Sequence, residues 1–166
     1  MAANPGETKR SGADPYMHTV TPHLVCAGAA KAIDFYKDAF GAQEMMRLEG
    51  PDGRLWHGSI RIGESLVMLA DEMPDYGSLG PKALKGTTVT LHLNVPDVDA
   101  FVAHATKAGA KIIMPVADAF WGDRYGQIED PFGHRWSVAT RVKTMTEDEI
   151  RAAMPTDAGC GPEAGG

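Results

Sequence analysis

The chain carries one structural plan twice, and this internal repeat limits its fold more than any other feature. The stretches HLVCAGAAKAIDFYKDAFGA (23–42) and HLNVPDVDAFVAHATKAGA (92–110) each begin with a His-Leu strand and turn into an amphipathic helix, which ends at a glycine before alanine. Three strand-like runs follow each helix, at 42–49, 54–63 and 64–72, and again at 110–117, 124–130 and 134–141. The order β-α-β-β-β twice predicts an α+β protein with eight strands.

The repeat also sets the predicted domain organisation. The folded body covers residues 18–154, with a first unit at 18–72, a second unit at 87–142 and a short helix at 144–154 whose N-cap is Thr146. The linker 73–86 contains Pro and Gly residues that are expected to break regular structure. The flanking segments 1–17 and 155–166 lack hydrophobic periodicity and are predicted to be disordered tails.

Charge and composition exclude several classes of partner. A net charge of −6 argues against nucleic acid, because phosphate binding needs a basic surface. No apolar run approaches the roughly 20 residues that span a bilayer, and the N-terminus lacks the apolar region of a signal peptide. The only cysteines, Cys26 and Cys160, do not make a disulfide framework, so we expect a cytoplasmic protein.

Strand alternation divides each sheet into an apolar face and a polar face. In TTVTLHLNV (87–95), Val89, Leu91 and Leu93 share the face expected to pack on a helix, and Thr90 and His92 point the other way. Two units placed edge to edge would curl into an eight-stranded sheet around a cavity lined by these polar faces. One hypothesis is a ligand pocket and the other is an ordinary solvent-exposed face. Six strand residues are the predicted lining, and they are His23, His57, Thr90, His92, Gln127 and Ser137.

The stretch FWGDRYGQIEDPFGHRW (120–136) adds three residues to this candidate site. Trp121 and Tyr125 suit a rim that stacks on a planar ligand, and Arg124 suits an anionic or carbonyl group because its fork binds such groups at two points. The alternative is structural: Arg124 pairs with Asp123 or Glu129, and Trp121 fills the end of the barrel. The sequence leaves both alternatives open.

The chain resembles the vicinal oxygen chelate superfamily, the glyoxalase/bleomycin-resistance/dioxygenase fold, and most closely its PhnB-like branch. The resemblance covers about residues 20–142 and rests on AIDFY…FGA (32–42) and DPFGH (130–134), in order within a doubled unit. It implies paired βαβββ units, a homodimer, a cavity inside the sheet and, in many members, a divalent metal.

The resemblance places the family's metal-ligand positions at Thr21, Val67, Thr90 and Ser137, none of which is a usual ligand for nickel, zinc or iron. We therefore predict no cofactor and a small, oxygen-rich or planar ligand. The alternative is a glyoxalase-type metal-dependent lyase, isomerase or dioxygenase whose displaced ligands are His23, His57, His92 and Glu129.

Overall fold

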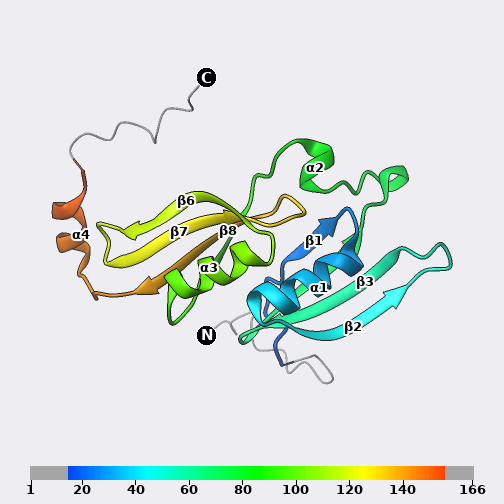
Figure 1. Ribbon diagram of the computed structural model, residues 1–166, viewed down its shortest axis with the longest axis horizontal. Helices are drawn as coiled ribbons and strands as arrows, with labels where there is room; N and C mark the ends of the chain where they lie inside the picture. The colour runs from blue at the N-terminus through cyan, green and yellow to red at the C-terminus, as the bar shows by residue number, and fades with distance from the viewer. Residues whose placement is uncertain (1–14, 156–166) are drawn as a thin grey trace, which may run out of the picture. The chain divides into compact units, whose positions relative to one another are not determined.

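The computed structural model describes residues 15–155, which form two compact units divided between residues 86 and 87. Each unit is a four-stranded sheet with one long helix packed against it (Figure 1). The order β-α-β-β-β is present twice, so the α+β class and the eight strands predicted from the repeat are confirmed.

The first unit has the spatial strand order β1-β4-β3-β2, in which β1 runs parallel to β4 and the other pairs are antiparallel. Its elements are β1 (His23–Cys26), α1 (Ala29–Phe40), β2 (Gln43–Glu49), β3 (Leu55–Ile62) and β4 (Ser65–Asp71). Helix α1 packs on the middle of this sheet, most closely on β3.

Helix α1 begins where a distant aspartate caps it. Asp71, the last residue of β4, accepts hydrogen bonds from the backbone N–H of Gly28 at 2.9 Å and of Ala29 at 2.7 Å, which satisfies two donors at the helix start. The helix ends at Gly41, whose φ of 64° is the left-handed C-cap predicted from the sequence. One strand end thus fixes the start of the helix that covers its own sheet.

The second unit repeats this arrangement with the order β5-β8-β7-β6. Its elements are β5 (Thr90–Asn94), α3 (Val98–Lys107), β6 (Lys111–Asp118), β7 (Asp123–Glu129), β8 (Arg135–Arg141) and a terminal α4 (Glu147–Ala153). Asp97 caps α3 by accepting from the N–H of Ala100, and Thr146 forms a capping box with Glu149 at α4, as expected.

Two details of the predicted boundaries are wrong. The linker contains a 3₁₀ helix, η1 (Pro74–Tyr76), and a four-residue helix, α2 (Pro81–Leu84), because proline is well tolerated in the first turn of a helix. The folded body also begins before residue 18, since the N–H of Leu66 donates to the carbonyl of Tyr16 at 3.1 Å. The rest of the predicted tails, 1–14 and 156–166, lies outside the described residues.

Strand parity in β3 follows the prediction, with one exception in burial. Gly58 faces the helix, because a Cβ there would lie 3.0 Å from Ile33 of α1, and Ile60 on the same face is fully buried. Trp56 has the same parity but is 48% exposed, so it does not pack on the helix. Its indole instead lies over Gly50, where a Cβ would come within 2.2 Å of the ring nitrogen.

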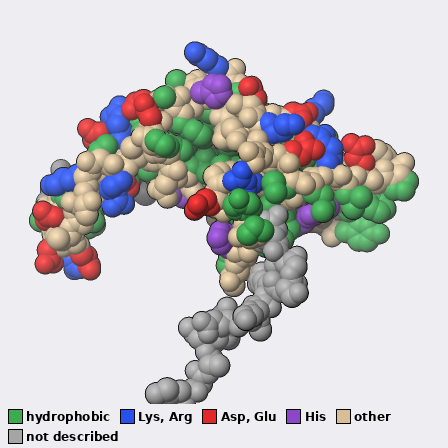
Figure 2. Space-filling view, turned by 90° about the horizontal axis from the view of Figure 1, so that it is seen from below, with side chains coloured by type: hydrophobic (Ala, Val, Ile, Leu, Met, Phe, Trp, Pro, Cys, Tyr) green, Lys and Arg blue, Asp and Glu red, His purple; other side chains and the backbone are tan. Residues whose placement is uncertain are grey.

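None of the helices within residues 15–155 has the length and apolar character needed to cross a membrane. Charged and hydrophobic side chains are interspersed on the face shown in Figure 2, and several large apolar residues of the edge strands β2 and β6 are exposed. Cys26 is buried within β1, whereas Cys160 lies outside the described residues.

Candidate ligand-binding site

Each sheet has one face covered by its helix and one face turned away from it, which we call the open face. In the second unit the helix-covered face carries Ile128, Trp136 and Val138, all at most 1% exposed. The alternate residues of the same strands lie on the open face. The parity predicted for β5, β7 and β8 is therefore confirmed, but Val89 lies before β5 and is 61% exposed, so the expectation that it packs on a helix is wrong.

Three predicted site residues form one row across the open face of the second sheet. The strand register pairs Gln127 of β7 with Ser137 of β8, and Ser137 with His92 of β5. The Nδ1 atom of His92 lies 2.8 Å from the hydroxyl of Ser137, and its Nε2 atom lies 3.3 Å from the side-chain oxygen of Asn94. These two contacts fix the plane of the His92 ring.

Aromatic rings continue this row. Tyr125 stacks on His92 with ring centroids 6.4 Å apart and 17° between the planes, and its hydroxyl accepts a hydrogen bond from Gln127 at 2.8 Å. Trp121 meets Tyr125 edge to face at 5.4 Å. Trp121, Tyr125, His92, Gln127 and Ser137 thus form one connected set, which we call the aromatic row.

Trp121 is also anchored from behind. Its indole N–H donates to Asp123 at 3.0 Å, and Arg141 bonds to the other oxygen of the same carboxylate. Asp123 is almost completely buried, and Trp121 is half-buried. The indole therefore has a fixed orientation with part of its ring accessible, which is compatible with both of its predicted roles.

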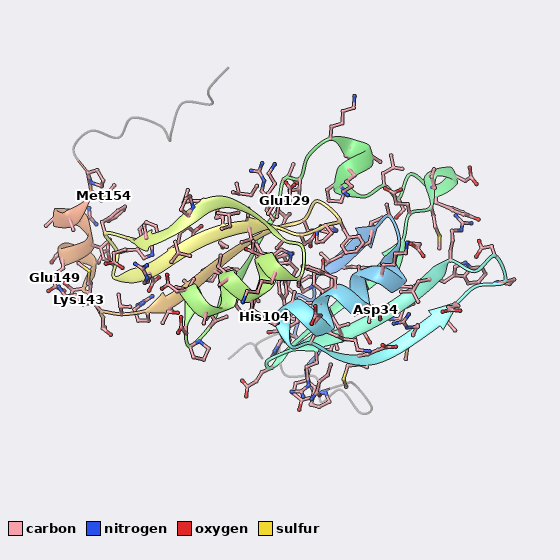
Figure 3. The ribbon with its side chains drawn as sticks, in the orientation of Figure 1. Asp34, His104, Glu129, Lys143, Glu149 and Met154 are labelled. Carbon is pink, nitrogen blue, oxygen red and sulfur yellow. The ribbon has the colours of Figure 1, made fainter. Side chains whose placement is uncertain are left out.

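Thr90 and Glu129 lie on the same open face, one row further along. The register aligns both with Arg135 of β8, and Thr90 is exposed. Glu129 is the last residue of β7 and is labelled in Figure 3. Both residues border the aromatic row without contributing to its hydrogen bonds.

Arg124 does not join the site. It follows the opposite parity to Tyr125, and its guanidinium forms a two-point ion pair with Asp99 of α3 at 2.5 and 2.9 Å and a third contact with Asp118 at 3.0 Å. These hydrogen bonds, Asp99 first, raise the pKa of Arg124, and Arg124 lowers the pKa of Asp99. The structural alternative for Arg124 holds, with these partners instead of Asp123 or Glu129.

His23 and His57 meet on the open face of the first sheet. Their rings are 6.1 Å apart and nearly perpendicular, although β4 lies between their strands. Partial burial, and secondarily the nearby His57, lower the pKa of His23 below 6.5. His23 is thus kept in its neutral form at neutral pH.

Methionines extend the rows of residues on both open faces. The first sheet has the row Met46–Ser59–Met68–His23, and the second has Met114–Gln127–Ser137–His92 at equivalent places. Thioethers adapt to ligands of different shape and contact aromatic rings favourably. Strand alternation puts Met68 on the face opposite to Val67, but its place beside His23 depends on the register of β1 and β4.

The family's metal positions do not fit a divalent cation here. Val67 pairs with Ile60 and is buried under the helix, so the open-face position on β4 is Met68, one residue on. Its counterpart on β8 is Ser137, and neither residue offers a carboxylate or imidazole. Among residues 15–155, no three His, Cys, Asp or Glu side chains cluster closely enough to hold a metal ion.

Comparison with known proteins places these two units in a family. Residues 16–138 match the profile of the Glyoxalase/Bleomycin resistance protein/Dioxygenase superfamily. The Mycobacterium tuberculosis protein Rv0887c is 47% identical over 152 residues, which cover 90% of this chain and 88% of that protein.

Solved structures agree with this assignment. TioX from Micromonospora sp. ML1 superposes with a TM-score of 0.60 and 25% identity, over 75% of this chain and 99% of TioX. TnmS3, an antibiotic binding protein from Streptomyces sp. CB03234, superposes with a TM-score of 0.57 and 21% identity, over 75% of this chain and 96% of TnmS3. A PhnB protein from Bacillus cereus superposes with a TM-score of 0.58 and 17% identity, over 74% of this chain and 99% of that protein. The doubled unit, the profile match and these neighbours show that the chain belongs to the glyoxalase/bleomycin resistance protein/dioxygenase superfamily.

Proposed function

We propose that this protein binds a small planar or oxygen-rich molecule on the open face of its second sheet, without the family's metal. The aromatic row is the observation that carries this proposal. An indole, a phenol and an imidazole lie in ring contact there, beside a hydroxyl and an amide. Stacking rings select a flat ligand, and hydroxyl, amide and imidazole groups can bond to its oxygens.

The packing of this face favours a ligand over plain solvent exposure. Ser137 is 5% exposed and Ala139 is 1% exposed, although both lie on the face turned away from the helix. His92 is held by Ser137 of the neighbouring strand and Tyr125 by Gln127 of its own strand, so their rings need little ordering when a ligand arrives. Such preorganisation lowers the entropic cost of binding.

The fold is compatible with this class of function. TnmS3, which shares the fold, is described as an antibiotic binding protein. A family member can therefore act by binding a small molecule. That likeness supports the class of function and leaves the ligand of this chain to experiment.

A titration with planar, oxygen-bearing aromatics tests the proposal. Hydroxylated naphthoquinones and flavones present a flat ring system with hydroxyl and carbonyl groups that match the aromatic row. We expect saturable quenching of Trp121 fluorescence, measured in a variant with Trp56→Phe to reduce background. Binding that is unchanged by Trp121→Ala and by His92→Ala would place the ligand elsewhere and overturn the proposal.

We also propose a homodimer. The edge strands β2 and β6 expose large apolar side chains, which are Met45, Met46, Leu48, Ile112, Ile113 and Met114. Exposed sheet edges with apolar residues are surfaces that proteins normally cover. Light scattering at micromolar concentration should give twice the mass of the chain, and a stable monomer would remove this proposal.

A cytoplasmic location is proposed from the cysteines. One is buried within a strand, and two cysteines in the whole chain give no disulfide framework. Fractionation of cells that express the tagged protein tests this, and recovery from the secreted fraction would contradict it.

A further inference from the structure

The open face of the first sheet carries an arginine, whereas the aromatic row of the second sheet contains none. Arg61 of β3 shares the parity of Ser59, so it points away from α1. Its Nη1 donates to the carbonyl of Gly63 at 2.9 Å, and its Nη2 donates to the side-chain oxygen of Gln43. Both acceptors are neutral, so they orient the guanidinium and leave its charge uncompensated.

Tyr16 holds the plane of this guanidinium. The Cζ atom of Arg61 lies 4.6 Å from the centre of the Tyr16 ring, which is a cation–π contact. The segment that carries Tyr16 is fixed along β4, because its carbonyl accepts from Leu66 and the carbonyl of Pro22 accepts from Met68. The remaining N–H groups of Arg61 therefore have a defined direction, as they would in a built anion site.

Within residues 15–155, no carboxylate lies within ion-pair distance of Arg61. The chain is acidic, and arginines 47, 54, 124, 141 and 151 each form an ion pair. Arg135 also lacks one, but it is exposed and has Glu129 directly opposite on the neighbouring strand. Arg61 therefore combines a fixed orientation with an unneutralised charge.

The neighbouring row suits the body of an organic ligand. Ser59 lies about 7 Å from Arg61, the distance of two residues along a strand, and Met68 and His23 lie beside Ser59 on the next two strands. A hydroxyl, a thioether and an imidazole can contact a fused two-ring aromatic. His57 closes the row from its far side, 6.1 Å from His23.

We propose that the open face of the first sheet binds a small aromatic carboxylate, with Arg61 holding the anionic group and the Ser59–Met68–His23 row holding the ring. The inference rests on the proposed function in one respect, that the open faces take small molecules. It goes beyond that function by assigning a binding surface to the first sheet and a negative charge to its ligand. Tyr16 is a positioning residue, because it acts through Arg61.

Two probes that differ only in charge test this inference. 2-Naphthoate and 2-naphthamide have the same flat rings, and only the first carries an anion. The Nε–H signal of Arg61, assigned from its loss in Arg61→Lys, is followed in nitrogen-15 spectra while each probe is added. We expect this signal to shift with naphthoate, and naphthoate to bind roughly tenfold more tightly than the amide.

Matched variants separate this charge from others. Arg61→Gln should weaken naphthoate binding roughly tenfold and leave naphthamide binding within about twofold. Arg124→Gln removes an arginine that is already ion-paired on the other face, and it should change neither. Tyr16→Leu keeps the charge of Arg61 and should give an intermediate loss. Thermal unfolding of each variant establishes that it is folded.

The outcomes distinguish this inference from the proposed function. If both probes quench Trp121 but neither moves the Arg61 signal, the inference is overturned and the aromatic row still stands. If neither probe binds at millimolar concentration, the inference is overturned, and the titration with naphthoquinones and flavones decides the proposed function separately. If inorganic phosphate shifts the Arg61 signal as strongly as naphthoate does, the ring row contributes nothing and the aromatic carboxylate is the wrong class.

Discussion

The imidazole of His92 and the phenol ring of Tyr125 lie parallel across a strand that separates them, with centroids 6.4 Å apart. The intervening strand β8 permits this contact because Ala139, directly opposite Tyr125, is too small to keep the rings apart. A flat, partly exposed surface results from the consecutive strands β7 and β8 together with β5, which is distant from them in sequence.

Removal of the indole at residue 121 should weaken ligand binding without unfolding the protein. Trp121→Ala deletes the ring that extends this surface, and we expect a loss of about 1–3 kcal/mol in binding free energy. The fold should persist because Asp123 keeps its ion pair with Arg141. Isothermal titration measures the affinity, and Trp121→Phe, which keeps a ring there, should lose less. Equal affinities in all three proteins would show that the indole is only structural.

The DPFGH turn should prove structural. Asp130 is 3% exposed and accepts hydrogen bonds from the backbone of Phe132 at 2.9 Å and of His134 at 3.0 Å, and from the indole of Trp136 at 2.9 Å. Asp130→Ala leaves these three donors without that acceptor, so we expect a loss of about 2–4 kcal/mol in unfolding free energy. Urea unfolding measures it.

An exposed aspartate in a comparable turn provides the control. Within residues 15–155, the side chain of Asp52 bonds only to Arg54, and both side chains are exposed to solvent. Asp52→Ala should therefore destabilise the protein much less than Asp130→Ala. Similar losses for the two variants would contradict the structural role assigned to Asp130.

Much of the fold could be predicted because the internal repeat agrees with the helical spacing and the strand alternation of the apolar residues. Helices near 30–40 and 97–108 and all eight strands follow from apolar spacing and from glycine positions. The predicted place of Arg124 at the rim is wrong, because β7 begins at Asp123 and the parity that turns Tyr125 toward the open face turns Arg124 toward α3.

Other features depend on register, which a single sequence does not fix. The contact between His92 and Tyr125 requires the alignment of β5, β8 and β7. The stacking of Tyr16 on Arg61 requires the path of a segment outside the repeat. The alignment that put a ligand position at Val67 was wrong by one residue, which is enough to move a side chain to the opposite face of the sheet.

Metal analysis should find far less than one equivalent of nickel, zinc or iron per chain. The family positions hold Thr21, Met68, Thr90 and Ser137, which supply no imidazole, thiolate or carboxylate. The measurement is elemental analysis of protein purified without chelator or added metal. One bound equivalent that disappears in both His57→Ala and His92→Ala would restore the metal-dependent alternative.

The last prediction concerns the titration of His23. Its pKa is lowered first by partial burial and second by His57, so it should titrate below 6.5 in proton spectra. His57→Gln removes only the second cause and should raise this pKa part of the way back. The unfolded chain then binds a proton at His23 more readily than the folded chain does. The contribution of neutral His23 to the free energy of unfolding is therefore complete above pH 6.5 and is lost as the pH falls through the folded-state pKa. Accordingly, His23→Gln should make unfolding free energy depend less steeply on pH below 6.5, and a titration of His23 above that value would contradict the prediction.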